Sequence, residues 1–235
     1  APVDWIWMGN TSKTTAYLAQ AIDNLKTRKR PPSPDDSLAV QTALAGLNLN
    51  VIVNNWGFDE MLFPSCGPMD ATNGCVERVH GIMPFTAYGD VSRGSSEMPK
   101  VVALHDKWRA RDARSSDGGT GDGATIGVPP DGGSLTTPSY ANVRYVQGYV
   151  SAMMFKVAVE RVIASGKELT GPNVKEAFET FKQVDTGGLS DKLSFGPNDH
   201  RPQSTETLYK FNAAGKLVPE PPSRTISLDD KWLGW

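Results

Sequence analysis

The sequence predicts an α/β protein with parallel strands, and three features of the chain indicate this fold class. Val51 to Val53 form an unbroken β-branched run, which is typical of a parallel strand covered on both faces. Residues 4–8 have the composition of another strand and lead into a helix. Apolar side chains recur at helical spacing over residues 143–165, which predicts a long helix with one face on a core.

The helix expected after residues 4–8 has a recognisable start and a modest apolar face. Thr11 or Ser12 can cap its first turn. Its apolar positions are Ala16, Leu18, Ala19 and Ile22. Residues 26–37 then form a charged excursion broken by prolines, in which no aromatic side chain lies between the clustered cations. We therefore interpret this segment as a surface connection and not as a nucleic-acid site.

The middle of the chain predicts a strand, a helix and a long loop. Residues 79–85 have strand character, and residues 100–112 show helical spacing. The residues at this spacing are Val101, Leu104, Lys107 and Trp108. Gly, Ser, Asp and Pro dominate residues 115–139, so we expect a surface loop there; its glycines lack the Lys-Ser/Thr pair of a phosphate-binding loop.

The last third of the chain predicts two helices, a short strand and a hairpin. Gly166 is expected to end the long helix, and Thr170 to cap the next one, with Pro172 in its first turn. Residues 191–195 indicate a short strand, and residues 206–218 alternate around a small turn as in a β-hairpin.

Composition excludes several classes of partner. The 235 residues include 24 Lys and Arg against 26 Asp and Glu, a net charge of −2. This balance argues against nucleic acid or an anionic membrane surface as the main partner. No apolar run approaches the roughly 20 residues of a membrane-spanning helix, so we expect no direct membrane insertion.

Cys66 and Cys75 are the only cysteines, and they lie in one loop rich in Gly, Pro, Asn and Asp. Two thiols are too few for a four-ligand zinc site, and the loop contains no histidine. We expect a local disulfide, which would stabilise the fold by roughly 2–3 kcal/mol and place the protein outside the cytoplasm. The alternative is two free thiols.

The sequence contains no recognisable catalytic or metal-binding motif. His80, His105 and His200 are far apart in the chain and fit structural roles. Asp199 precedes His200, but adjacent residues in a turn seldom point together, and no nucleophile is implied. We therefore predict no catalytic residues, no metal and no cofactor.

The segment after Val53 has the composition of a ligand-binding loop. In open α/β sheets, ligands bind beyond the carboxyl ends of the strands. Trp56 can stack on a ligand, and Gly57 allows close approach to the backbone. Hydrogen-bonding groups follow from Asn54, Asn55, Asp59 and Glu60. The alternative is a plain strand-to-helix loop in which the two acids favour a helix N-terminus.

Several segments together resemble a known family. They are residues 145–181, 185–202 and 209–218, with residues 4–21 and 48–60 in the first half. In this order they resemble the ABC-transporter substrate-binding proteins of the branched-chain amino-acid class, which are type I periplasmic binding proteins. The run from "DTGGL" through "DHRP" to "YKF" carries most of the resemblance.

The resemblance implies two Rossmann-like α/β lobes joined by three crossing strands, with the ligand held between them. Residues 1–98 are similar to the second lobe, and residues 99–205, with the Gly-rich loop, to helices and a strand that return to the first lobe. Residues 206–235 are similar to the final hairpin and tail that cross back. The first lobe is then incomplete, and the chain is similar to the C-terminal portion of a longer protein.

In this family the loops after these two strands contact the ligand. The resemblance implies ligand-binding roles for Gly9, Asn10, Thr11, Asn55, Trp56 and Gly57. Amino-acid-binding relatives often place an acid near the second loop for the ligand's ammonium group, whereas Trp56 stands at that place here. An aromatic or less charged molecule is therefore as good a candidate as an amino acid.

The function implied is that of a non-catalytic solute-binding component of an ABC importer. Its partners would be a small-molecule ligand and a membrane permease. It would act in the periplasm or another extracytoplasmic space after secretion of a longer precursor. The alternatives are a ligand-sensing regulatory domain of the same fold and an enzyme on a Rossmann-like scaffold, because fold alone does not discriminate among them.

Overall fold

The computed structural model describes residues 5–9, 15–21, 50–60, 62, 79–115, 142–203, 205–212, 216–220 and 224–225. The chain divides into two compact units. Unit 1 comprises Ala1–Pro84 and Ser204–Trp235, and unit 2 comprises Phe85–Gln203. The Gly-rich segment from residue 116 to 141 lies outside the described residues. No helix in the described part of the chain is long and apolar enough to cross a membrane.

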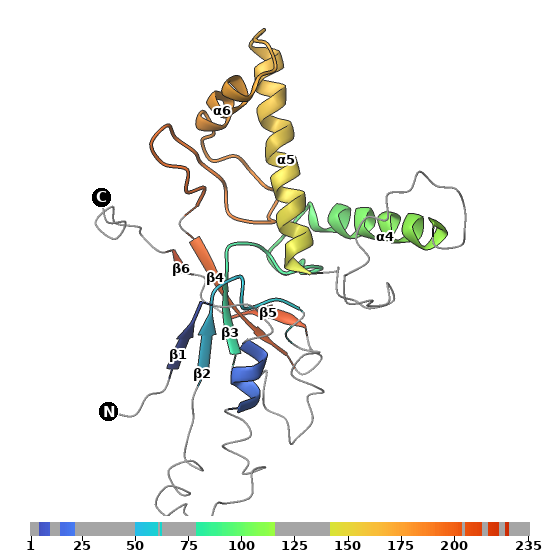
Figure 1. Cartoon of the computed structure of the whole chain (residues 1–235), viewed down its shortest axis with the longest axis vertical. Helices are drawn as coiled ribbons and strands as arrows, with labels where there is room; N and C mark the ends of the chain where they lie inside the picture. Colours follow the sequence, from blue (N-terminus) through green and yellow to red (C-terminus); the bar gives the residue numbers. More distant parts are fainter. Residues whose placement is uncertain are drawn as a thin grey trace, which may run out of the picture. The chain divides into compact units, whose positions relative to one another are not determined.

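Unit 1 is built on a mixed sheet whose path follows the chain order β1-β2-β3-β4-β5 (Figure 1). β1, β2 and β3 are parallel, as predicted, and the β4–β5 hairpin extends the sheet in antiparallel pairing, while β6 pairs with β4. The strands are β1 (Trp5–Met8), β2 (Asn50–Val53), β3 (Val79–Met83), β4 (Thr205–Phe211), β5 (Leu217–Pro219) and β6 (Arg224–Thr225).

One face of this sheet is buried because side chains alternate between its two faces. The buried face carries Val51, Val53, Val79, Met83 and Tyr209, none of which is accessible to solvent. Residues 15–21 are helical and contribute Ala16 and Ala19 to the buried part of unit 1. On the other face, Ile52, Ile82 and Leu208 are only half-buried. The prediction that residues 51–53 are covered on both faces therefore holds fully for one face only.

Unit 2 is built on three helices, α4 (Met98–Ser115), α5 (Val143–Ala164) and α6 (Gly171–Glu179) (Figure 1). The predicted C-terminal end of α5 and the predicted N-terminal cap of α6 are confirmed. Thr170 caps α6 by accepting the Asn173 N–H, and Gly166 follows α5 with φ +71°. α5 buries Val146, Val150, Met154, Ala158 and Val162 in a core that also includes Met98 and Phe181.

Two of the four residues at the predicted helical spacing of α4, Leu104 and Lys107, are exposed. Leu104 is 47% exposed, whereas His105 is buried with Met98 and Val101. His105 lies among the rings of Tyr88, Trp108 and Tyr145, at centroid distances of 5.4, 5.9 and 5.0 Å. The imidazole packs among these aromatic rings on the buried side of the helix. Leu104, one residue earlier and therefore about 100° around the helix, faces the solvent.

The short strand predicted at residues 191–195 is wrong, because only isolated bridges form there. Val184 pairs with Leu193 through two backbone hydrogen bonds of 2.8 and 2.9 Å. The residues between them enter a turn in which the Thr186 hydroxyl donates to the Ser190 carbonyl over 2.8 Å. Gly188, in the same turn, has φ +79°. This turn leaves too few extended residues to continue a ladder.

Glu206 on β4 provides a prediction about pH. Its Oε2 atom is buried without a hydrogen-bond partner among the described residues, and burial raises the pKa of the Glu206 carboxyl to about 6. The fold therefore favours the protonated form, so this contribution to stability is present below the ordinary pKa of 4.5 and is lost as the pH rises through about 6.

We expect Glu206→Gln to stabilise the protein at pH 7.5 and to have little effect at pH 4. The rise in the pKa of Glu206 corresponds to about 2 kcal/mol in the absence of solvent screening. Because the side chain is only half-buried, screening reduces the expected gain in stability to about 1 kcal/mol. Urea unfolding of both proteins at the two pH values measures the difference. An equal effect at both pH values would show that Glu206 does not titrate in this way.

Candidate functional site

The candidate site is the edge of the sheet where the parallel strands of unit 1 end. Met8 of β1 lies beside Val53 of β2, so Gly9 and Asn54 leave the sheet as neighbours. A Cβ atom built on Gly9 would lie 3.8 Å from Asn54 Nδ2, which is an ordinary contact. The parallel pairing therefore brings the two predicted loops together at their first residues.

Asn54 closes the first turn of the loop that follows β2. Its side-chain Oδ1 accepts the backbone N–H groups of Trp56 and Gly57, each over 3.1 Å, and its carbonyl accepts the Gly57 N–H over 3.0 Å. This is the local hydrogen bonding by which Asn stabilises turns. Asn54 thus shapes the loop. The sequence alone does not show whether an asparagine here closes a turn or binds a ligand.

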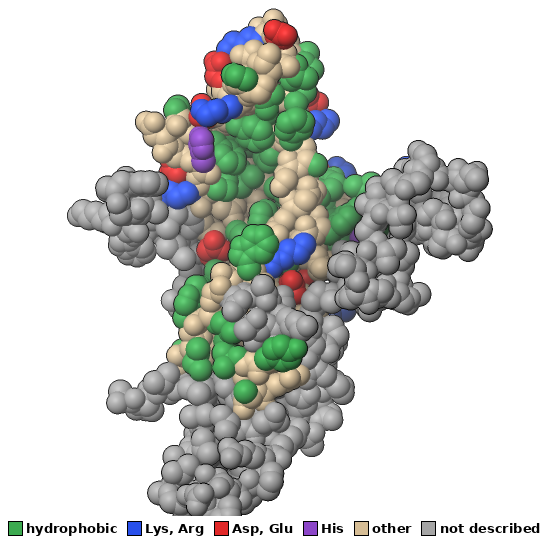
Figure 2. Space-filling view, viewed as in Figure 1, with side chains coloured by type: hydrophobic (Ala, Val, Ile, Leu, Met, Phe, Trp, Pro, Cys, Tyr) green, Lys and Arg blue, Asp and Glu red, His purple; other side chains and the backbone are tan. Residues whose placement is uncertain are grey.

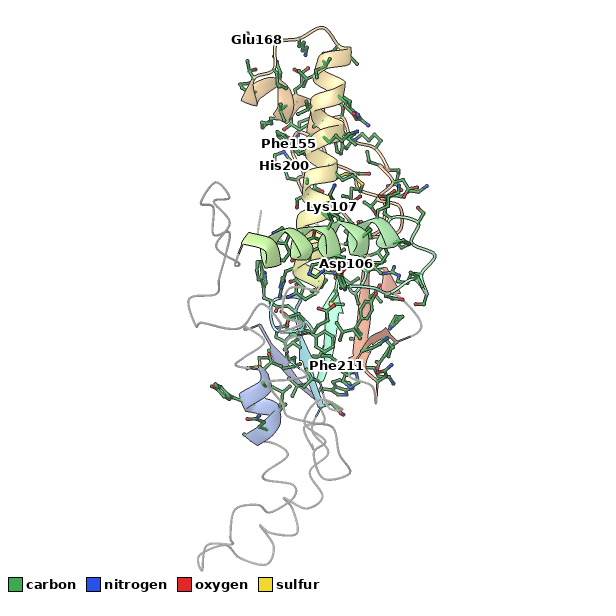
Figure 3. All side chains as sticks on the ribbon, turned by 90° about the vertical axis from the view of Figure 1, so that its right-hand side faces the viewer. Asp106, Lys107, Phe155, Glu168, His200 and Phe211 are labelled. Carbon is green, nitrogen blue, oxygen red and sulfur yellow. The ribbon has the colours of Figure 1, made fainter. Side chains whose placement is uncertain are left out.

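Phe58 anchors the other side of the same loop. It is fully buried, and its ring lies 5.2 Å from that of Phe211 on β4. Gly81 on β3 makes room for it, because a Cβ atom there would lie 1.9 Å from the Phe58 ring. Figure 3 marks Phe211 on the sheet of unit 1. The loop is therefore held between the Asn54 turn and the Phe58 anchor.

Trp56 is the side chain that this anchored loop presents to solvent. It is 64% exposed, although Gly57, Phe58 and Asp59 beside it are buried. Trp56 therefore does not pack into the core of unit 1. An exposed indole on a loop fixed at both sides is a suitable surface for stacking, because little entropy is lost when a ligand binds a pre-organised side chain.

The acids beyond Trp56 contribute differently from their expected role. Asp59 is only 6% exposed, and its carbonyl accepts the Leu62 N–H over 3.0 Å. Glu60 is half-buried. A buried Asp59 does not offer its carboxylate to a ligand at the surface, whereas Glu60 keeps partial access to solvent.

The structure describes four of the six residues expected to bind ligand. Gly9, Asn55, Trp56 and Gly57 all lie at this edge, with Asn55 half-buried. Asn10 and Thr11 lie outside the described residues, and so do Cys66 and Cys75. Contact of any of the six with a ligand, and the disulfide, stay predictions.

Asp199 and His200, the adjacent pair in the turn after Gly196, each interact with a different residue. Asp199 accepts two hydrogen bonds of 2.7 Å from the Arg201 guanidinium, which holds the pKa of its carboxyl at about 2. His200 lies 3.1 Å from Glu179 instead. Asp199 and His200 therefore do not act as a dyad. Within the described ranges, no group of His, Cys, Asp and Glu could hold a metal ion.

The chain has an α/β fold that is similar to part of the substrate-binding proteins of ABC transporters. Three solved structures are similar over 95% of this chain. They are an ABC transporter substrate-binding protein from Aeropyrum pernix (20% identity, TM-score 0.54), a branched-chain amino-acid ABC transporter protein from Thermus thermophilus with bound valine (12%, 0.61), and a fatty-acid ABC transporter substrate-binding protein from Thermomonospora curvata (14%, 0.57).

The chain spans less than half of each of these proteins, namely 45%, 46% and 43% of their respective lengths. This coverage fits the prediction that the chain is similar to a C-terminal portion of such a protein. No protein-family model matches the sequence, and no curated protein sequence matches it either. The similarity therefore rests on the fold.

Proposed function

We propose that this chain is part of a solute-binding component of an ABC importer, with a ligand contact at the carboxyl edge of β1 and β2. The observation that carries the proposal is the exposed Trp56 on a loop anchored at both sides, in the fold of substrate-binding proteins. Gly9, Asn10 and Thr11 supply backbone and side-chain groups from the neighbouring loop. Asn55 and Gly57 flank the indole. Because the proposed role is binding, it requires no catalytic residue.

The ligand class that suits this edge is a small molecule with an aromatic or amide group. Trp56 offers apolar area and a π face, and Asn55 offers hydrogen bonds. Asp59, the nearest following acid, is buried, which disfavours a ligand that depends on its ammonium group at this loop. Two of the similar structures are named for molecules with an aliphatic part, one with bound valine and one from a fatty-acid transporter.

Delivery to a membrane permease outside the cytoplasm follows from this role. The expected Cys66–Cys75 disulfide supports that compartment, because such bonds persist in oxidising environments. Mass spectrometry after alkylation without reductant tests it. We expect both thiols to be protected from alkylation, and two alkylated cysteines in secreted protein would contradict the bond and remove its support for the location.

We expect Trp56→Ala to weaken ligand binding and to leave the fold nearly unchanged. Loss of one stacking contact costs about 1–3 kcal/mol of affinity, and an exposed side chain contributes within about 0.5 kcal/mol to stability. Calorimetric titration of the polypeptide as its organism makes it measures the affinity; the probes are L-valine, L-phenylalanine, benzamide and octanoate. Thermal melting measures the stability of the variant.

Trp5→Ala is the matched control for this experiment. Trp5 is 49% exposed and lies at the opposite end of β1, where it contacts His80 at a ring distance of 5.0 Å. We expect the control to bind the probes as the unchanged protein does. Equal affinities of both variants would remove Trp56 from the site, and turnover of an amide or ester probe would contradict a non-catalytic role.

A further inference from the structure

The two ends of the Asn54 side-chain amide have different surroundings. Its Oδ1 atom accepts the backbone N–H groups of Trp56 and Gly57, each over 3.1 Å. These two donors fix the orientation of the amide, because a flipped amide would set its NH2 group against two N–H groups. The Nδ2 atom therefore points away from this turn, with two hydrogens to donate.

Gly9 leaves an open position beside the Asn54 Nδ2 atom. A Cβ atom built on Gly9 would meet only this nitrogen within 4 Å among the described residues, at 3.8 Å. Gly9 does not have a positive φ, so its backbone conformation does not itself require glycine. It is also exposed. A group from solvent can therefore approach the Gly9 backbone and the Asn54 amide at the same point.

The Asn54 Nδ2 atom has donor capacity that the described part of the chain does not use. Asn54 is half-buried, and its side-chain hydrogen bonds within the described residues are the two that its Oδ1 atom accepts. An amide NH2 group donates two hydrogen bonds and accepts none. The position beside Gly9 therefore suits a hydrogen-bond acceptor, and it gives no bond to an ammonium group, which can only donate.

Aromatic area lies close to this donor along the chain, because Trp56 is two residues from Asn54 and is 64% exposed. Figure 2 shows hydrophobic side chains at the surface of unit 1, and the exposed aromatic residues of this unit include Trp5, Trp7 and Trp56. A small molecule with an oxygen acceptor next to a flat or apolar group can therefore use the Asn54 amide and the Trp56 indole together.

We propose that Asn54 and Gly9 form an acceptor subsite, in which the Asn54 NH2 group donates to a carbonyl or carboxylate oxygen of the ligand that lies over Gly9. The proposal rests on the proposed binding function of this edge of the sheet. It narrows the ligand class to molecules that have such an oxygen beside the group that contacts Trp56. A molecule with only an amine at this end does not fit.

Asn54→Asp tests the direction of this hydrogen bond. An aspartate keeps an oxygen for the Trp56 and Gly57 N–H groups, so the turn is retained, but it replaces the NH2 group with a second acceptor. We expect benzamide to bind about fivefold more weakly, benzoate to lose more because its charge is repelled, and benzylamine to lose nothing. Calorimetric titration of the polypeptide as its organism makes it measures all three. In the unchanged protein, the tighter of benzamide and benzoate distinguishes an amide from a carboxylate ligand.

Asn50→Asp is the matched control for charge, because Asn50 begins β2 at the opposite end of the strand. We expect it to bind the three probes as the unchanged protein does. Gly9→Ala tests the open position separately. Since its methyl group makes only an ordinary contact at 3.8 Å, we expect an unchanged melting temperature, together with binding of benzamide about fivefold weaker.

Two results would overturn the acceptor subsite. One is that Asn54→Asp weakens benzylamine as much as benzamide, and the other is that Gly9→Ala binds benzamide as the unchanged protein does. If Trp56→Ala still weakens binding in that case, the proposed function stands and only the subsite is wrong. If Trp56→Ala also has no effect on the probes, this edge does not bind them and the proposed function fails as well.

Discussion

Replacing Gly81 with alanine is expected to destabilise unit 1 by about 3 kcal/mol or more, the upper range for overpacking a core. The added Cβ atom would lie 1.9 and 2.0 Å from two atoms of the Phe58 ring and 2.5 Å from the Phe58 Cβ atom. Because the Cβ atom of Phe58 is also too close, a rotation of the ring cannot relieve the overlap. The β3 strand or the loop after β2 must move.

Urea unfolding followed by circular dichroism measures the change for Gly81→Ala. Gly148→Ala is the matched control, because a Cβ atom there meets open space and the residue is helical. We expect the control to be more stable than the unchanged chain by up to about 1 kcal/mol. A Gly81→Ala protein as stable as the control would mean that Phe58 does not lie over β3.

Phe58→Ala is the second change with a large expected effect, a loss of about 3–5 kcal/mol as for other buried aromatic side chains. Phe58 is fully buried and contacts Phe211 at a ring distance of 5.2 Å, so its removal leaves a cavity against the sheet. Phe155→Ala is the control, since Phe155 is 55% exposed. Urea unfolding of the two variants should differ clearly, and equal losses would contradict the anchoring role of Phe58.

The two large effects are coupled, which allows a direct test of the contact. In the Phe58→Ala background the overlap with the two ring atoms is removed, and only the Cβ atom at position 58, 2.5 Å away, still has to move. We therefore expect the double variant to be more stable than the sum of the two single losses predicts. Additive losses would indicate that the two residues do not touch. The same anchor holds Trp56 outward, so Phe58→Ala should also weaken ligand binding.

Sequence patterns sufficed for elements whose signals are local. Thr170 caps α6 through a hydrogen bond to a residue three positions away, and Gly166 follows α5 in the left-handed conformation that glycine favours. The β-branched run at Val51 to Val53 forms a strand, and the alternation after residue 205 forms the β4–β5 hairpin. These interactions lie within a few residues of one another, so the sequence itself contains both partners.

The sequence also predicted two candidate loops that follow parallel strands, and the structure brings the first residues of these loops together. Gly9 and Asn54 become neighbours because parallel strands end at the same side, which is a property of the strand type rather than of distant contacts. The predicted strand at residues 191–195 failed for a related reason. Only Leu193 pairs, with Val184, and the turn closed by Thr186 and Ser190 lies between these two residues.

Tertiary structure alone decided which side chains point inward where the local pattern allows two choices. Trp56 and Phe58 are both aromatic and lie in one loop, yet Phe58 is buried because Gly81 on β3 and Phe211 on β4 leave a space that its ring fills. On α4, three aromatic rings bury His105 and leave Leu104 outside. Thus the sequence by itself determined the fold class and the edge that carries the candidate site. Which residues face the core depended on partners far along the chain, because burial is a property of the space that packed elements leave and not of one segment's composition.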